Sequence, residues 1–262
     1  MAGTITVEPV DGDVLWVTLD HAGKFNAMSR AMWRSLHSVF ADIQRDASVR
    51  CVVLQGRGGQ FCAGGDIAEY ADFRFEESSL RDFHENDVWG GLQAVLDCDV
   101  PVIARIEGNC MGAGVEIASC CDIRIASDTA RFGAPIAKLG FPMAPREAAL
   151  VLRAVGELTA REMLLSAAVL DAAQMQHRGF LNQIVPVPEL DAAVGVYVNR
   201  IRALAPQAAR MNKKTFRALA PVGIGEYATE LIANAYRYAS SAEHVEGVSA
   251  FTAKRPPRFG RL

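Results

Sequence analysis

The chain has 262 residues, 50% of them hydrophobic, and can bury a large core as one domain, with or without an appended helical segment. Its 27 basic and 30 acidic residues give a formal charge of -3, which argues against nucleic acid as a partner. No uncharged stretch approaches the roughly 18 apolar residues of a membrane span, and the N-terminus carries Glu8 and Asp11 rather than a basic leader. We therefore expect a cytoplasmic protein with no membrane partner.

The first elements predicted are a hairpin and a helix. Residues 5–7 and 14–19 alternate in polarity around Asp11-Gly12, which is typical of two strands joined by a tight turn. Apolar residues then recur at helical spacing from Ser29, a capping residue, to about residue 45.

Two further cycles of strand, turn and helix follow. Residues 51–54 are a buried-strand run closed by glycines. Residues 100–106 are a second such run, followed by a glycine turn, a helix over 115–121 and a strand over 122–126. This repetition predicts an α/β core of stacked units.

From about residue 145 the pattern becomes helical. Thr159-x-x-Glu162 and Asp171-x-x-Gln174 resemble capping boxes, and each predicts a helix start. After a strand over 181–187, residues 188–253 read as three or four helices. Breaks are expected at Pro206, Pro221 and Gly225. No flexible linker precedes this helical tail, so we expect it to pack on the core or on a neighbouring subunit.

The cysteines and histidines carry no metal or disulfide signature. None of the six cysteines forms a C-x-x-C pair, and most lie among apolar residues, as reduced and packed cysteines do. The five histidines show neither H-x-x-x-H nor H-E-x-x-H spacing. We expect no metal and no bound cofactor.

The glycine turn at Gly112-Ala113-Gly114 is the most informative motif. Because the first N–H groups of a helix lack partners within it, such a turn can hold an anion, and Glu116 lies one turn further on. A dinucleotide fingerprint would need glycine where Ile117 stands, so a nicotinamide-dependent oxidoreductase is disfavoured. A purely structural turn, with an acidic residue favoured by the helix dipole, is the plain alternative.

A second glycine turn, over residues 60–67, favours the catalytic interpretation of the first turn over the structural one. It again places small residues between a strand and a helix, so the backbone N–H of Ala63 could donate to the same oxygen as Ala113. Two such donors form an oxyanion hole, and Glu116 beside them could transfer a proton.

With these motifs, the chain resembles the enoyl-CoA hydratase/isomerase (crotonase) superfamily over nearly its whole length. The matching segments are Asn26-Ala27-Met28, 61–67, 108–122 and a tail running from Glu246-Gly247 through Phe251 to Lys254-Arg255-Pro256. The resemblance implies an α/β fold, a spiral of β-β-α units over residues 1–190, with a C-terminal helical region over 191–262. That region would take part in trimerisation and in the CoA site, and the assembly would be a homotrimer or a dimer of trimers.

The same resemblance implies where the substrate binds. The N–H groups of Ala63 and Ala113 would hold the thioester carbonyl of an acyl-CoA, which is the substrate and not a cofactor. The expected CoA-binding residues are Lys24, Ala63, Gly64, Gly65, Asp66, Ile67, Gly112, Ala113, Phe251 and Lys254. The lysines could instead be solvated charges, and Phe251 could be a core residue.

Glu116 is the expected general acid/base, with a pKa raised by an apolar pocket. Hydratases of the family hold water between two glutamates, but the second position is Ile136 here. Glu147 is the nearest downstream carboxylate. We expect it to make a surface or capping contact, and a role as substitute for the missing glutamate is the alternative. Hydration of a 2-enoyl-CoA remains the best single prediction. Isomerisation, decarboxylation or another lyase reaction, and non-catalytic acyl-CoA binding, are the alternatives.

The acyl group itself is not specified by the sequence. The segment 68–89 holds five aromatic residues that could line or cover the acyl pocket, although packing is the expected use of about half of them. They are Tyr70, Phe73, Phe75, Phe83 and Trp89.

Overall fold

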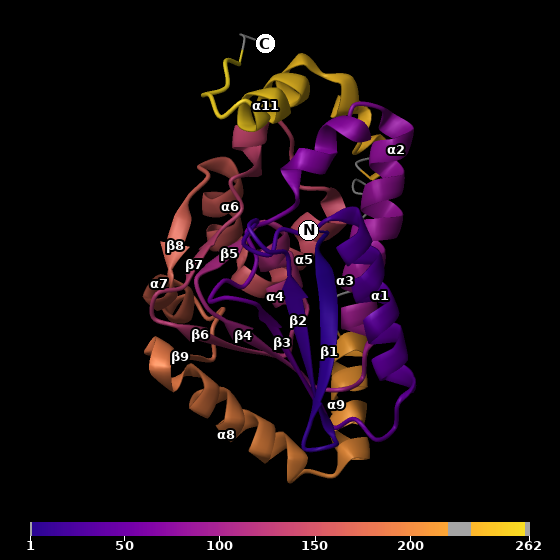
Figure 1. Ribbon diagram of the computed structural model, residues 1–262, viewed down its shortest axis with the longest axis vertical. Coiled ribbons are helices and arrows are strands. Elements are labelled where there is room, and N and C mark those ends of the chain that lie inside the picture. Colours follow the sequence, from indigo (N-terminus) through magenta and orange to yellow (C-terminus); the bar gives the residue numbers. More distant parts are fainter. Residues whose placement is uncertain (1, 220–231, 260–262) are drawn as a thin grey trace.

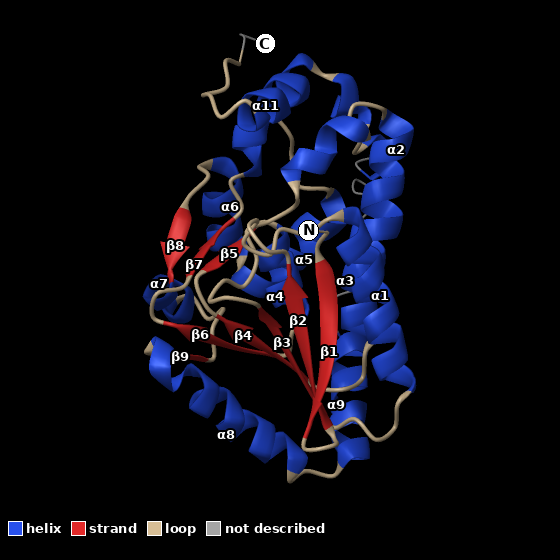
Figure 2. Ribbon diagram, in the orientation of Figure 1, coloured by secondary structure: helices blue, strands red, loops and turns tan. Residues whose placement is uncertain are grey.

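The computed structural model describes residues 2–219 and 232–259, and its strands form two sheets (Figure 2). The larger sheet has the order β1-β2-β3-β4-β6-β9, and the smaller has the order β5-β7-β8. The β1–β2 and β7–β8 pairs are antiparallel and the other pairs are parallel. The strands are β1 (Thr4–Val10), β2 (Val14–Asp20), β3 (Cys51–Gly56), β4 (Val102–Ile106), β5 (Asn109–Met111), β6 (Ile123–Ser127), β7 (Arg131–Gly133), β8 (Val169–Asp171) and β9 (Gln183–Val185).

Helices separate most of these strands and make up the C-terminal region. The α-helices are α1 (Arg30–Arg45), α2 (Glu77–Asp82), α3 (Trp89–Asp97), α4 (Ala113–Cys120), α5 (Pro145–Val155), α6 (Glu157–Leu165), α7 (Ala172–His177), α8 (Leu190–Arg202), α9 (Pro206–Leu219) and α11 (Ala242–Thr252). A π-helical segment, η2 (Phe83–Val88), joins α2 to α3. Short 3-10 segments are η1 (Ile67–Asp72), η3 (Ile136–Leu139), η4 (Val187–Glu189) and η5 (Arg237–Ser240).

The N-terminal predictions are confirmed. Asp11 and Gly12 both adopt positive φ, at 54° and 81°, and join β1 to β2 as a tight hairpin turn requires. The Ser29 side chain accepts a hydrogen bond from the N–H of Met32 at 3.2 Å and so caps α1.

Two hydrophobic layers cover the large sheet on its opposite faces. In β3, Val52 and Leu54 join the core that α1 and α3 complete, whereas Cys51 and Val53 join a second cluster with α8. This alternation is the period of a strand with both faces buried. Figure 1 shows α8 beneath the strands and α11 at the opposite end of the molecule.

The second half of the chain gives mixed outcomes. Asp171 and Gln174 form the expected capping box at α7. The prediction at Thr159 is wrong: α6 is capped three residues earlier by Gly156, at φ 81°, and Thr159 is buried inside the helix. Pro206 begins α9 as expected, whereas Pro221 and Gly225 lie outside the described residues.

The structure also describes the state of the cysteines and the apolar character of the helices. The six cysteines all belong to the described part of the chain, where they are buried and free, as the sequence predicted. Among residues 2–219 and 232–259, no helix is both long and apolar enough to cross a membrane.

Candidate active site

The two glycine turns are bonded directly to each other. The N–H of Cys62 donates to the carbonyl of Asn109 at 2.8 Å, and the N–H of Met111 donates to the carbonyl of Cys62 at 2.9 Å. Gly114 permits this approach, because a Cβ there would lie 2.8 Å from the Cys62 carbonyl oxygen. Segments about 50 residues apart in the sequence therefore present adjacent backbones to one place.

A cavity of about 780 Å³ opens beside these turns. It is lined mainly by apolar side chains, as substrate pockets usually are. Every residue that the sequence singled out for the site lines it: Lys24, Ala63, Gly64, Gly65, Asp66, Ile67, Gly112, Ala113, Glu116, Phe251 and Lys254.

Ala113 is the first residue of α4 and offers a backbone donor to this cavity. Its N–H has no hydrogen-bond acceptor among the described residues, whereas that of Gly112 donates to the Gly133 carbonyl at 2.8 Å. The N–H at the start of a helix also carries the positive end of the dipole. The backbone at Ala113 can therefore stabilise a negative oxygen.

The N–H of Ala63 is already hydrogen-bonded within the protein, whereas the sequence predicted a donor for the substrate oxygen. It donates to the carbonyl of Phe25 at 3.0 Å. Phe25 belongs to a loop in which it and Asn26 both have positive φ, and its side chain is exposed. A substrate oxygen would have to share this N–H with the Phe25 carbonyl or replace it, so Ala113 is the donor that is ready in this structure.

Glu116 lies in the first turn of α4 and faces the same cavity. Its pKa is raised to about 8, chiefly by burial and to a lesser extent by the nearby Glu147, and Arg74 opposes the shift. Glu116 is therefore mainly protonated at neutral pH and can give a proton. The raised pKa agrees with the expectation from an apolar pocket.

Ile136 also lines the cavity, next to Pro135. The position where the family has its second glutamate thus presents an aliphatic side chain to the substrate space. It can neither bind water nor exchange a proton, so any second polar group must come from elsewhere.

Glu147 does not make the surface contact expected of it. It is 2% exposed, and its Oε1 lies 3.0 Å from Nδ1 of His84. The other ring nitrogen of His84, Nε2, is buried without a hydrogen-bond partner, and His84 lines the cavity. The expectation for Glu147 was wrong because its helix, α5, packs against the core with this side chain inward.

His84 is the site residue that sequence reasoning missed, since the histidines were tested only for metal-ligand spacing. Burial lowers its pKa below the ordinary 6.5, against the opposing effect of Glu147. The imidazole is therefore neutral at pH 7. With Nδ1 donating to Glu147, the lone pair of Nε2 is free to accept a proton.

The remaining predicted ligands lie on exposed parts of the cavity wall. The Nζ of Lys24 is 2.5 Å from Oδ2 of buried Asp66, so this lysine is ion-paired. Phe251 is 55% exposed and thus not a core residue, and Lys254 is exposed. Both come from α11 and its end, which cover the cavity of their own chain.

The aromatic segment divides as expected between lining and packing. Tyr70 and Phe83 line the cavity. Phe73, Phe75 and Trp89 pack against the core. Gly65 contacts Tyr70 so closely that a Cβ would lie 2.0 Å from its hydroxyl oxygen, so the glycine sets the position of the ring.

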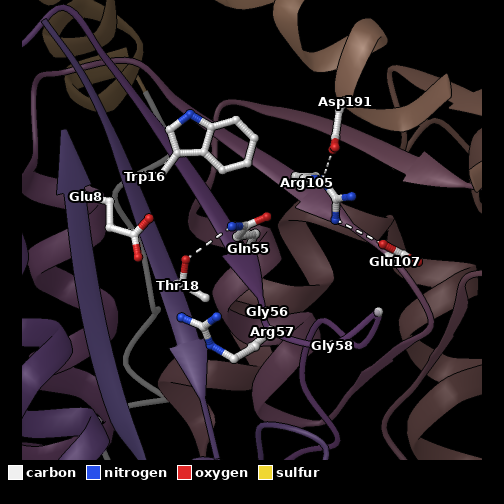
Figure 3. A pocket seen from close by; sticks show the side chains of 11 residues that line it. Glu8, Trp16, Thr18, Gln55, Gly56, Arg57, Gly58, Arg105, Glu107 and Asp191 are labelled. Carbon is white, nitrogen blue, oxygen red and sulfur yellow. Dashed lines mark hydrogen bonds and ion pairs between the residues drawn. The ribbon is translucent and has the colours of Figure 1, made fainter. Parts of the chain in front are cut away.

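A smaller polar hollow of about 300 Å³ lies over the large sheet, away from these residues (Figure 3). Its central Arg105 pairs with Glu107 at 3.1 Å and with Asp191 at 2.6 Å. None of the residues expected in the site lines this hollow. The main cavity is therefore the candidate active site.

The main cavity of this α/β fold combines a helix N-terminus, a carboxyl group with a raised pKa and a histidine with a lowered pKa. The sequence profile of the family "Enoyl-CoA hydratase/isomerase" matches residues 10–261, and the chain belongs to this family.

Individual relatives of the chain are also named as enoyl-CoA hydratases. The chain is 31% identical over 259 residues to "Probable enoyl-CoA hydratase echA8" of Mycobacterium tuberculosis, covering 98% of this chain and 97% of that one. It is 32% identical over 205 residues to the short-chain-enoyl-CoA hydratase of Clostridium acetobutylicum, covering 78% and 77%. A crystal structure of an enoyl-CoA hydratase/carnithine racemase from Magnetospirillum magneticum superposes with a TM-score of 0.80 at 34% identity, covering 98% and 95%.

Proposed function

We propose that the protein adds water to the double bond of a 2-enoyl-CoA thioester. The observation that carries this proposal is the pair Glu116 and His84, which line one cavity with pKa values pushed in opposite directions. One group holds a proton at neutral pH and the other can accept one, and such pairs mark the acid and the base of an active site. The names of the relatives support the same reaction.

The reaction balances with these two groups. Nε2 of His84 takes a proton from water, and the resulting hydroxide forms a bond to C3. The double-bond electrons move to C2 and the thioester carbonyl, whose developing negative charge is stabilised by the N–H of Ala113. Glu116 then gives its proton to C2, which yields the 3-hydroxyacyl-CoA. The proton on His84 returns to Glu116 through solvent as the product leaves.

Glu147 positions the base. As acceptor of the Nδ1 proton at 3.0 Å, it fixes the ring orientation and the tautomer that leaves Nε2 unprotonated. It also stabilises the imidazolium that forms when His84 takes the proton. In this proposal His84 and Glu147 replace the second glutamate that Ile136 removes.

The CoA portion would follow the exposed side of the cavity. We assign its contacts to the loop 63–67, to Gly112, and to Lys24, Phe251 and Lys254. Assembly as a homotrimer or a dimer of trimers belongs to the same proposal. It is supported by large apolar side chains that are exposed in the single chain, among them Leu158, Leu165, Phe216 and Leu219.

Double-bond isomerisation is the second candidate. Ile136 favours it, since an isomerase needs one group that shuttles a proton between two carbons and has no need of a water-binding glutamate. Glu116 would fill that role alone.

A direct assay separates the candidates. The purified protein is mixed with 2-enoyl-CoA and 3-enoyl-CoA thioesters that end in either a methyl or a carboxylate, and the products are identified by mass spectrometry. Formation of 3-hydroxyacyl-CoA, abolished in Glu116→Gln, supports hydration. Conversion of 3-enoyl to 2-enoyl thioesters without hydroxyacyl product would assign an isomerase. Tight binding of every thioester with no turnover would assign an acyl-CoA-binding protein.

A further inference from the structure

Arg74 is a buried cation in the wall of the same cavity. Its side chain is 1% exposed, yet no carboxylate of the described residues lies within ion-pairing distance of it. One guanidinium nitrogen, Nη2, donates to the hydroxyl of Tyr238 at 3.2 Å. Nε is buried without any hydrogen-bond partner. A buried charge left in this state is costly unless something else completes its contacts.

The aromatic rings around Arg74 compensate only part of that cost. The guanidinium carbon lies 4.2 Å from the ring centre of Tyr70 and 4.1 Å from that of Phe141, which are attractive cation–π distances. Contact with the ring faces leaves Nε without a hydrogen-bond partner.

Arg124 shows how the same chain satisfies a structural arginine. Its guanidinium donates to the backbone carbonyls of Ala118, Cys121 and Phe180, and so it ties the end of α4 to the segment at Phe180. Arg74 makes no comparable set of bonds. The difference is that Arg74 keeps an unused donor, Nε, in the wall of the cavity.

Arg74 lies toward the reacting end of the cavity, because its guanidinium contacts the ring of Tyr70, whose hydroxyl lies against Gly65 in the loop 63–67. Its charge reaches Glu116 and lowers the pKa of that carboxyl group. Lys24 and Lys254, by contrast, lie on exposed parts of the wall, where the phosphates of CoA would be found. An anion that meets Arg74 is therefore carried by the acyl group and not by the nucleotide end of CoA.

We propose that Arg74 binds a carboxylate on the acyl group, so that the preferred substrates are CoA monothioesters of dicarboxylic acids. This assignment of the substrate class rests on the proposed function only in taking an acyl-CoA as the ligand. The planar guanidinium matches a carboxylate, which can accept from Nε and complete the contacts of that nitrogen. A lysine at this position would offer no such fork.

Binding of this carboxylate also favours the chemistry. It neutralises Arg74 and so removes the influence that opposes the raised pKa of Glu116. The proton donor is then retained when the correct substrate is bound. A methyl-terminated acyl group would leave the buried guanidinium of Arg74 without a carboxylate acceptor, and this penalty gives the discrimination.

Binding calorimetry with two saturated thioesters of equal chain length tests the proposal without turnover. Glutaryl-CoA carries the terminal carboxylate, and pentanoyl-CoA ends in a methyl group. We expect the wild-type protein to bind glutaryl-CoA roughly tenfold or more tightly than pentanoyl-CoA. Arg74→Met should lose this preference and retain the affinity for pentanoyl-CoA. Arg161→Met, at an exposed arginine paired with Glu157, is the matched control and should keep the preference.

Equal wild-type affinities, or a preference that persists in Arg74→Met, would overturn the proposal. The wild-type comparison needs no variant, so it tests the proposal even if Arg74→Met does not fold. The proposed hydration can fail separately: an Arg74-dependent preference without any hydroxyacyl product would retain the ligand class and refute the reaction. Hydration of neutral thioesters without any binding preference would retain the reaction and refute the ligand class.

Discussion

Nδ1 of His84 lies 3.0 Å from Oε1 of Glu147, and this contact joins two segments 63 residues apart. His84 belongs to the π-helical segment η2, and Glu147 belongs to the first turn of α5. Both side chains are buried, and the far nitrogen of the imidazole remains unpaired beside the cavity. The arrangement is that of a base held in place by a carboxylate.

Replacing the base should remove most of the activity. We expect His84→Gln to lower kcat by about 10² to 10⁴, the usual contribution of a positioned proton acceptor. Steady-state kinetics on the hydration reaction measure this loss. His37→Gln, at an exposed histidine of α1, is the control and should leave kcat unchanged. Full activity in His84→Gln would show that the base lies elsewhere.

Glu147→Gln should act through His84 and not on the substrate. We expect kcat to fall less than in His84→Gln, with KM nearly unchanged, because the imidazolium loses its stabilising carboxylate. Glu147 raises the pKa of His84, so its replacement should move the acid limb of the pH–rate profile to lower pH. A reduced rate with an unmoved acid limb would assign Glu147 a purely structural role.

The pH dependence of kcat/KM should be bell-shaped. Activity should fall above about pH 8, where Glu116 loses the proton it must give. It should also fall on the acid side, at a pH below the ordinary histidine value of 6.5, where His84 becomes protonated. A rate that climbs steadily from pH 7 to pH 9 would reverse the roles assigned to these two groups.

Removing one backbone donor tests the oxyanion site. Proline is tolerated at the first position of a helix, and so Ala113→Pro deletes this N–H with little expected cost to α4. We predict a loss of about 10² to 10³ in kcat, while circular dichroism stays unchanged. Ala113→Ser keeps the N–H and should keep the activity. If the proline variant turns over normally, the carbonyl oxygen is held by other groups.

The contact between the two turns should tolerate no added methyl group. In Gly114→Ala, the new Cβ would meet the Cys62 carbonyl oxygen at 2.8 Å, and the turns would have to separate. We expect lower thermal stability and lower kcat. Gly90→Ala, in α3 with no atom within 4 Å of the added Cβ, should be neutral or stabilising by up to about 1 kcal/mol. Equal melting temperatures for the two variants would contradict this packing argument.

Much of the site was predictable because it is built from local backbone geometry. The glycines at 112 and 114, the capping serine at position 29 and the capping box at 171–174 each act within a few residues of their own position. Such signals can be read from a single sequence. All eleven residues that the sequence assigned to the site do line one cavity.

The rest depends on tertiary packing that no local pattern reveals. The contact of His84 with Glu147 needs η2 and α5 to meet in space. The burial of Arg74 depends on rings contributed by Tyr70 and Phe141. The bond from the Ala63 N–H to Phe25 depends on a loop with two positive-φ residues that are not glycine. The histidines were tested only for metal-ligand spacing and Arg74 was assigned no role, yet His84 and Arg74 both line the cavity.

Labelled water gives the most direct test of the central claim that Glu116 and His84 add water across a double bond. The enzyme is run on a 2-enoyl-CoA in water enriched in heavy oxygen and deuterium, and the product is analysed by mass spectrometry. The account predicts one heavy oxygen at C3 and one deuterium at C2 in each new product molecule. Deuterium without heavy oxygen would mean that the site forms an enolate but does not hydrate, and would contradict the account.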